Sequence, residues 1–230
     1  MTRKRLVLLV EGDGDVEAAP VLLARLLHEY QAFDAVFLDP HPFRVGEYSK
    51  ISRQEFAKWR RYLRAVAKRK DLGGCLLLLD GDSRAKVEGQ PFCAMRAAGC
   101  LADEARKEVA GRSFSVAIVF ACTEYESWLI AGVQSLGGKQ FTDGSNQMPD
   151  QIKAPPPHPE SAPRDAKGWL GGVMKTGYKP TRDQAELTRL VDLNLIRRQE
   201  MRSFRRLESA VQGLVRAVRC GEHAVTPASA

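Results

Sequence analysis

Three apolar segments of the chain are each followed by carboxylate side chains, the ligands that a hard divalent cation prefers in proteins. The acids of this pattern are Glu11, Asp15, Asp80, Asp82, Glu124 and Glu126. Clustered carboxylates repel one another, so a cluster without a cation would be costly. If the fold brings the three segments together, these residue types predict a site for Mg²⁺ or Mn²⁺.

The segment Asp80-Gly81-Asp82 carries the most specific part of this pattern. Its central glycine lets the chain turn tightly, so both aspartates can point toward one ion. Each acid also has a plainer structural interpretation, since Asp15 can cap a helix and Asp-Gly pairs are common in turns. The joint occurrence of acids after three segments favours the metal site over those separate interpretations.

A sheet has to position these acids, and the first half of the chain alternates strand and helix patterns. Apolar runs typical of buried strands cover residues 5–10, 33–38, 75–79 and 116–120. Apolar residues at helical spacing cover residues 16–30, 53–70, 92–110 and 126–134. This alternation predicts an α/β fold with a mostly parallel sheet flanked by helices. Ligands bind beyond the carboxyl ends of the strands in such sheets, where all three acidic segments would meet.

The second half of the chain is less regular. We expect residues 1–135 to form the α/β domain and the Gly- and Pro-rich residues 136–165 to form a flexible loop or lid. Helical patterns return near Lys167, from Arg182 to Ile196, and from Arg202 to Val218. Residues 166–222 are therefore predicted to be a helical extension that packs on the same domain, and residues 223–230 a frayed tail.

Positive charge is concentrated in two segments of the chain, whose net charge is +7. Residues 50–70 contain nine Lys and Arg against one acid, and residues 164–219 contain thirteen against six. Positive surface attracts polyanions, although such charges can also merely solvate a helix face. We expect nucleic acid as a partner, contacted by Arg53, Arg60, Arg61, Arg64, Arg197, Arg198, Arg205 and Arg206.

Several other classes of protein are excluded by the sequence. The chain has no apolar run of eighteen residues, and Glu11 ends its first short apolar run, so we expect neither a membrane span nor a signal peptide. Five cysteines without C-x-x-C spacing are typical of reduced thiols, which predicts a cytoplasmic protein. No Gly-Lys-Ser/Thr loop is present, and the loop after Val10 lacks the third glycine of a dinucleotide fingerprint.

The chain has a strand ending in Glu-Gly, a helix, another strand-helix unit and then a strand ending in Asp-x-Asp. This order resembles the Toprim fold of topoisomerases, primases and OLD-type nucleases. The resemblance covers roughly residues 5–135. It is closer to the OLD-type nucleases and to a family of small bacterial Toprim-like proteins with a domain of unknown function. Asp15 stands where those nucleases carry a second acid. The segments Glu124-Tyr125-Glu126-Ser127-Trp128 and Ser203-Phe204 are similar to further elements of these families.

The resemblance implies metal-dependent phosphodiester cleavage, in bacterial defence and alongside an ATPase partner. Carried over residue by residue, it assigns catalysis to Glu11, Asp80, Asp82 and Lys175. The metal would be held by Glu11, Asp15, Asp80, Asp82, Glu124 and Glu126. The nucleases often carry another acid where this chain has Ala85, which puts a complete two-metal site in doubt.

Two other functions compete with the nuclease. The first is a catalytically inactive Toprim-like module that binds nucleic acid or an ATPase partner, which the missing acid at Ala85 favours. The second is a phospho-acceptor receiver domain, in which Asp80 would be the acceptor and Thr123 the switch residue. A receiver domain is less consistent with the sequence, because no later strand ends in Lys-Pro.

Overall fold

A parallel sheet of six strands forms the centre of the computed structural model, which describes residues 2–108, 110–145 and 147–228. The main strand order is β2-β1-β4-β5-β6, and β3 also pairs with β1. Every pairing between these strands is parallel. The strands are β1 (Lys4–Val10), β2 (Val36–Leu38), β3 (Phe43–Arg44), β4 (Leu72–Asp80), β5 (Ser115–Ala121) and β6 (Val225–Thr226).

Eight α-helices flank the sheet within the described part of the chain, so the predicted α/β fold is confirmed. They are α1 (Asp13–Glu29), α2 (Tyr48–Ala67), α3 (Ala94–Lys107), α4 (Glu126–Ala131), α5 (Ala166–Val173), α6 (Ala185–Leu190), α7 (Leu193–Arg198) and α8 (Arg202–Cys220). Two shorter turns join them, the 3₁₀-helix η1 (Val133–Leu136) and the π-helical η2 (Pro180–Gln184). None of the helices described is long and apolar enough to cross a membrane.

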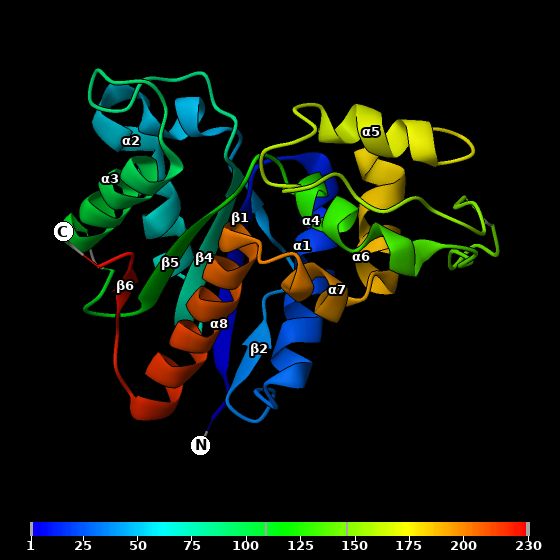
Figure 1. Cartoon of the computed structure of the whole chain (residues 1–230). Coiled ribbons are helices and arrows are strands. Elements are labelled where there is room, and N and C mark those ends of the chain that lie inside the picture. The colour runs from blue at the N-terminus through cyan, green and yellow to red at the C-terminus, as the bar shows by residue number, and fades with distance from the viewer. Residues whose placement is uncertain (1, 109, 146, 229–230) are drawn as a thin grey trace.

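The sheet separates two hydrophobic cores. Successive side chains of a strand point to opposite faces, so Leu6 and Leu8 enter one core while Val7 and Leu9 enter the other. The first core also contains α1, α4 and α8, and the second contains α2 and α3, as Figure 1 shows. Because both faces are covered, the central strands are apolar at nearly every position, which explains their continuous apolar runs in the sequence.

Several predicted elements differ in extent from the observed ones, among them the helix expected from Arg182 to Ile196, which is divided into η2, α6 and α7. The helix expected over residues 53–70 begins at Tyr48, and non-helical backbone from Arg53 to Phe56 interrupts it. The strand expected over residues 33–38 is limited to β2, and the side chain of Phe33 is exposed. Residues 33–35 therefore lie outside the strand, although the carbonyl of Ala35 accepts the backbone N–H of Lys4.

The C-terminal third of the chain packs on the sheet. Leu207, Val211 and Leu214 of α8 lie in the same core as Leu76 and Leu78 of β4. The prediction of a frayed tail is wrong for Val225 and Thr226, which pair with β5 as strand β6. Arg106 of α3 donates a hydrogen bond to the carbonyl of Val225 and holds this short strand in place.

Residues 136–165 contain no strand or α-helix among their described positions after η1. The side chains of Phe141 and Met148 are nevertheless buried in the first core. The carboxylate of Glu160 accepts the backbone N–H groups of Arg202 and Ser203, at 2.8 and 2.5 Å, and so caps the start of α8. These contacts anchor the segment to the domain.

Candidate active site at the carboxyl edge of the sheet

The site lies where the strand order reverses. The chain leaves β1 for β2 on one side and returns to β4 on the other, so the carboxyl ends of β1 and β4 form a topological switch point. Glu11 directly follows β1, and Asp80 is the last residue of β4. A carboxylate oxygen of Glu11 accepts the backbone N–H of Asp80 at 3.1 Å, so the structure brings these two predicted site residues together.

The loop after β5 adds the next two acids. The backbone N–H of Tyr125 donates to the Asp80 carboxylate at 2.9 Å, which places Glu124 and Glu126 on either side of that contact. Gly81 lies so close to β5 that a Cβ atom there would meet the carbonyl oxygen of Ala121 at 2.8 Å. The glycine between the two aspartates is therefore required by close packing of β4 against β5.

Lys167, in the first turn of α5, lies among these acids. Its ammonium nitrogen is 3.4 Å from a carboxylate oxygen of Glu124, 3.6 Å from one of Glu126 and 3.8 Å from one of Asp80. The sequence prediction missed this residue and selected Lys175 instead. Lys175 is exposed and, among the described residues, forms no ion pair with these acids.

A signal for Lys167 was present in the sequence. Asp165 caps α5 by accepting the backbone N–H of Gly168 at 2.8 Å. An aspartate two residues before a lysine at a helix start is a recognisable cap, and it fixes Lys167 in the first helical turn. Because the segment before α5 is long and irregular, the sequence did not show where this helical turn lies relative to the sheet.

Two side chains from the C-terminal half orient the outer acids. Gln184 of η2 donates to Asp15 at 2.7 Å, and the hydroxyl of Tyr178 donates to Glu126 at 2.9 Å. Asp15 also accepts the backbone N–H of Gly12 at 2.9 Å, so it stabilises the start of α1 as well. The predicted helical extension thus supplies part of the site rather than only covering the domain.

The remaining acids have free oxygen atoms. Asp82 is exposed, and the structure shows no hydrogen bond to its side chain among the described residues. One carboxylate oxygen of Glu124 is buried without a hydrogen-bond partner. A buried carboxylate oxygen normally has a donor or a cation beside it, so this atom is suited to bind one.

Burial and mutual repulsion make the acids favour protonation or a cation. Burial raises the pKa of Glu11 to about 7, and the charges of Asp15 and Asp82 add to this effect although the Asp80 N–H opposes it. Burial likewise raises the pKa of Asp80, with further contributions from Asp15, Glu11 and Glu126. Burial opposes the charge on Lys167, but Glu126, Asp80 and Glu124 outweigh it and raise its pKa. Lys167 therefore stays charged and neutralises part of the cluster.

The donor set fits a hard cation, although the side chains are not arranged around one. Within the described residues, no group of three or more His, Cys, Asp or Glu side chains is positioned to hold a metal ion. Lys167 stands at the centre of the acids instead, with its ammonium within 4 Å of three of them. The oxygen ligands and the unpartnered atom of Glu124 match the chemistry of Mg²⁺ or Mn²⁺.

Residues 10–212 match the family described as "Domain of unknown function (DUF4276)". The chain belongs to this family. No curated protein matches it. The family match begins directly before Glu11 and ends within α8, so it includes all six acids, Lys167 and the two C-terminal side chains that orient the acids.

The acid-x-acid-x-Trp and Ser-Phe elements of this DUF4276 chain meet beneath the site. The indole N–H of Trp128 donates to the hydroxyl of Ser203 at 2.8 Å, and both groups are buried. The rings of Trp128 and Phe204 pack edge to face, with centroids 5.6 Å apart. This contact attaches α8 to α4, the helix that begins at Glu126.

The arginines proposed for nucleic acid divide into two groups. Arg60 pairs with Glu104 at 2.8 Å, Arg64 pairs with Glu108 at 2.8 Å, and Arg197 pairs with Glu29 and Glu208. These ion pairs connect α2 with α3, and α7 with α1 and α8, and they leave those three side chains less able to contact phosphate. The remaining candidates are exposed: Arg53, Arg61, Arg198, Arg205 and Arg206.

Proposed function

We propose that this DUF4276 protein is a metal-dependent phosphodiesterase that acts on nucleic acid, like the Toprim-type nucleases its sequence resembles. One observation carries the proposal: the acids of three neighbouring strand ends share a half-buried edge with a single lysine. Such a cluster of carboxylates with raised pKa values is typical of a site that binds a cation and performs chemistry.

Glu11, Asp80 and Asp82 would hold the Mg²⁺ or Mn²⁺ ion. Such an ion polarises a phosphoryl oxygen and lowers the pKa of a bound water. Gln184 and Tyr178 fix the orientation of Asp15 and Glu126, as outer partners of metal ligands commonly do.

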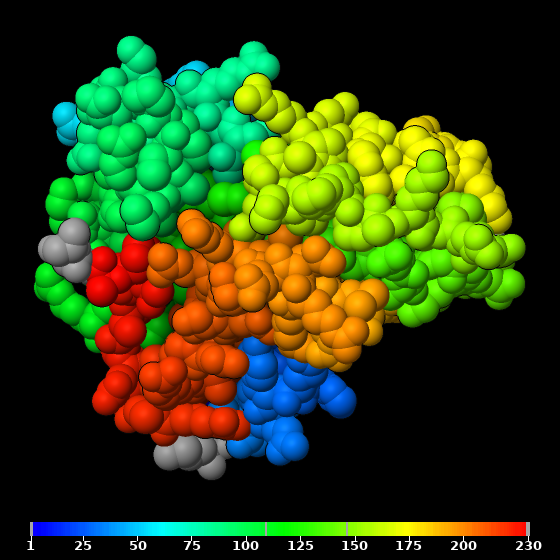
Figure 2. Space-filling model, in the orientation of Figure 1, coloured from blue at the N-terminus to red at the C-terminus, as the bar shows by residue number. Residues whose placement is uncertain are grey.

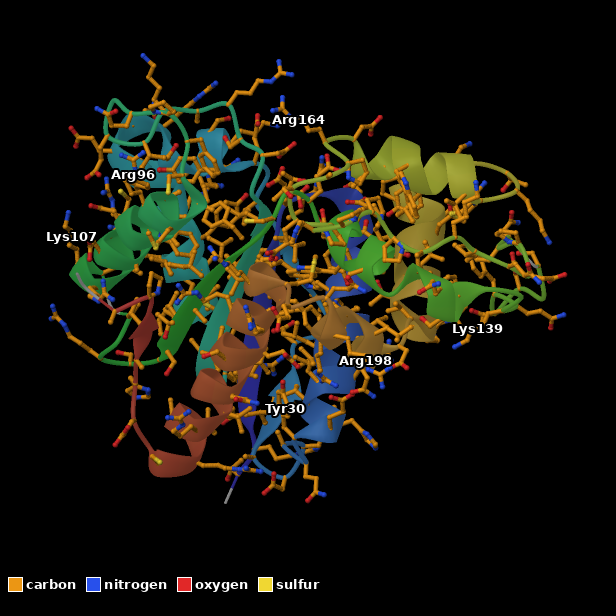
Figure 3. The ribbon with its side chains drawn as sticks, in the orientation of Figure 1. Tyr30, Arg96, Lys107, Lys139, Arg164 and Arg198 are labelled. Atoms are coloured by element: carbon orange, nitrogen blue, oxygen red, sulfur yellow. The ribbon has the colours of Figure 1, made fainter. Side chains whose placement is uncertain are left out.

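Lys167 takes the role that the sequence prediction gave to Lys175. Its ammonium lies at the same edge as the acids, where it can stabilise negative charge that develops on a phosphate. Arg164 lies at the top of the view in Figure 3, between α5 and the side of the molecule that carries α2 and α3. It is exposed and can contact a phosphate of the same strand.

A cleavage assay with matched lysine variants tests this proposal. We expect Mn²⁺-dependent cleavage of single-stranded or duplex nucleic acid by the wild-type protein, and a loss of roughly 100-fold or more in Lys167→Met. Lys175→Met should retain wild-type activity, because its side chain is exposed and lies outside the cluster. Equal activity of both variants would refute the role of Lys167, and no cleavage with any substrate would refute the enzyme.

The inactive binding module is a second candidate, and one observation favours it. The Lys167 ammonium already neutralises part of the charge of Asp80, Glu124 and Glu126, which reduces the repulsion that a metal ion would otherwise have to offset. A module of this kind should bind nucleic acid or an ATPase partner equally well in EDTA and in Mn²⁺. Metal-dependent cleavage by the wild-type protein would exclude it.

A further inference from the structure

A cavity of about 290 Å³ opens beside the acidic site, at the outer edge of β5. Strand β6 pairs with β5 only at Val116 and Ala117. The next part of β5, which includes Ile118 and Phe120, faces the cavity. The walls come from α3, β5, the start of α8 and Pro227. Figure 2 shows this hollow on the near face, below the residues of α3 and above those of α8.

The floor and one wall of the cavity are apolar. Ile118 and Phe120 line it from β5, and Ala94, Met95 and Ala98 line it from α3. Met95 is 71% exposed, more than any other large hydrophobic side chain in the described part of the chain. An exposed methionine at the mouth of an apolar cavity is typical of a binding surface, since its flexible thioether adapts to a flat ligand.

The opposite wall is positively charged. Arg202 and Arg206 line the cavity from the first turns of α8. Both are exposed, and neither guanidinium takes part in an ion pair with another described residue. Glu160 also lines the cavity, but both its carboxylate oxygens accept backbone N–H groups of α8. The cavity therefore suits a ligand with a flat apolar body and an anionic group.

Cys122 connects the cavity to the acidic site. It lines the cavity, and its sulfur would lie 3.1 Å from a Cβ atom on Gly81, between the two aspartates. It also precedes Glu124 by two residues. A group bound in the cavity thus lies next to the turn that carries Asp80 and Asp82.

We propose that this cavity receives one base of a single-stranded nucleic acid, with Arg202 and Arg206 on the adjoining phosphates. The assignment of nucleic acid as the ligand rests on the proposed function. The cavity restricts the proposed substrate to unpaired strands. A volume near 300 Å³ is at the lower end of small-ligand pockets and admits one base rather than a base pair. Bases in such sites contact apolar side chains while arginines follow the backbone. Two further arginines close to Arg202 and Arg206 in the sequence are exposed, Arg205 of α8 and Arg198, which Figure 3 labels at the end of α7.

The test measures binding separately from cleavage. Fluorescence anisotropy in EDTA would compare labelled oligodeoxythymidine of about twelve nucleotides with a duplex of equal length. Arg206→Gln should weaken single-strand binding about fivefold or more and lower its salt slope by about one. Met95→Ser removes apolar contact without changing charge, and should weaken single-strand binding roughly threefold while leaving duplex binding unchanged. The matched control is Arg216→Gln, an exposed arginine on α8 outside the cavity, which should bind as the wild type does.

Several outcomes would overturn the inference. Duplex bound as tightly as the single strand, equal effects of Arg206→Gln and Arg216→Gln, or no effect of Met95→Ser would each do so. Efficient competition by polyglutamate would indicate an acidic peptide as the occupant instead. If the protein cleaves nucleic acid but shows none of these binding effects, the proposed function stands and the inference about the cavity is refuted. If single-strand binding depends on Arg206 but no cleavage is found, the inference about the cavity is supported and the proposed enzymatic activity is refuted.

Discussion

Asp80 connects the strand ends and the helix that together form the site. Its backbone N–H donates to Glu11, its carboxylate accepts the N–H of Tyr125, and the same carboxylate lies 3.8 Å from the Lys167 ammonium. The ends of β1, β4 and β5 and the start of α5 are therefore held in one arrangement by this residue. Its burial keeps the carboxyl pKa raised, so its charge has a strong effect on stability.

Replacing Asp80 and Asp82 by Asn should remove the response of the protein to metal. An ion that binds only the folded state raises its melting temperature by mass action. We expect Mn²⁺ to stabilise the wild type and not the double variant, which should still fold because Asn preserves the shape. Because repulsion between carboxylates is relieved, the double variant should melt at an equal or higher temperature in EDTA. Four melting curves, two proteins with and without Mn²⁺, measure this, and an equal metal response of both proteins would exclude the site.

The acidic residues also predict how stability depends on pH. Glu11 has a pKa raised from 4.5 to about 7 in the folded protein, so the folded state binds more protons than the unfolded state between these values. The stabilisation is complete below pH 4.5 and is lost as the pH rises through 7. In EDTA the melting temperature should therefore fall from about pH 5 to about pH 8, and Glu11→Gln should flatten the fall. If Glu11→Gln and the wild type have the same dependence of melting temperature on pH, the pKa of Glu11 is not raised.

At the scale of elements, the contact between α4 and α8 determines how firmly the C-terminal helix supports the site. Ser203→Ala leaves the buried indole N–H of Trp128 without an acceptor, which should lower the free energy of unfolding by about 1–3 kcal/mol. In a Trp128→Phe background the same substitution should cost much less, because no N–H remains to be satisfied. Urea denaturation of the four proteins measures the coupling, and additive effects would contradict it.

The segment between η1 and α5 should be the first part of the folded protein that protease cuts. Lys153 and Arg164 are exposed in irregular backbone, whereas Phe141 and Met148 are buried. Limited trypsin digestion should therefore cleave after Lys153 or Arg164 and give two fragments that remain associated on gel filtration. Initial cleavage in α2, which is richer in Lys and Arg, would show that this segment is more firmly packed than expected.

At the scale of the whole molecule, positive charge serves two purposes. On the face covered by α2 and α3, Arg60 and Arg64 pair with Glu104 and Glu108. Around α7 and the start of α8, exposed arginines form no ion pairs with described residues. Arg53 and Arg61 of the segment 50–70 are likewise exposed and form no ion pair with described residues, so both basic segments keep side chains that can bind a polyanion.

The salt dependence of nucleic-acid binding separates these two regions. Replacing Arg198 and Arg205 by Gln should lower the salt slope by roughly one unit for each phosphate that the protein no longer neutralises. Replacing Arg60 and Arg64 by Gln should instead lower thermal stability and change the slope little. The reverse result would assign nucleic-acid binding to α2, one of the two segments that the sequence predicted for this role.

The sequence by itself determined the parallel sheet and the meeting of the strand-end acids. Strands buried on both faces have to be apolar at almost every position, so β1, β4 and β5 were recognisable without their partners. Parallel pairing then places their carboxyl ends at one edge, which brings Glu11 next to Asp80. These features depend on local composition and on general rules of sheet topology.

Only the tertiary structure decided which side chains complete or leave the site. Lys167, Tyr178 and Gln184 approach the acids from a part of the chain joined to the sheet by an irregular segment, so sequence spacing could not locate them. The pairing of Arg60 with Glu104 likewise joins residues on two helices that are adjacent only after packing. Strand β6 is too short to have a pattern of its own and exists because β5 offers it an edge. In each case the partner lies far away in the sequence, and the free energy of the contact appears only when the chain has folded.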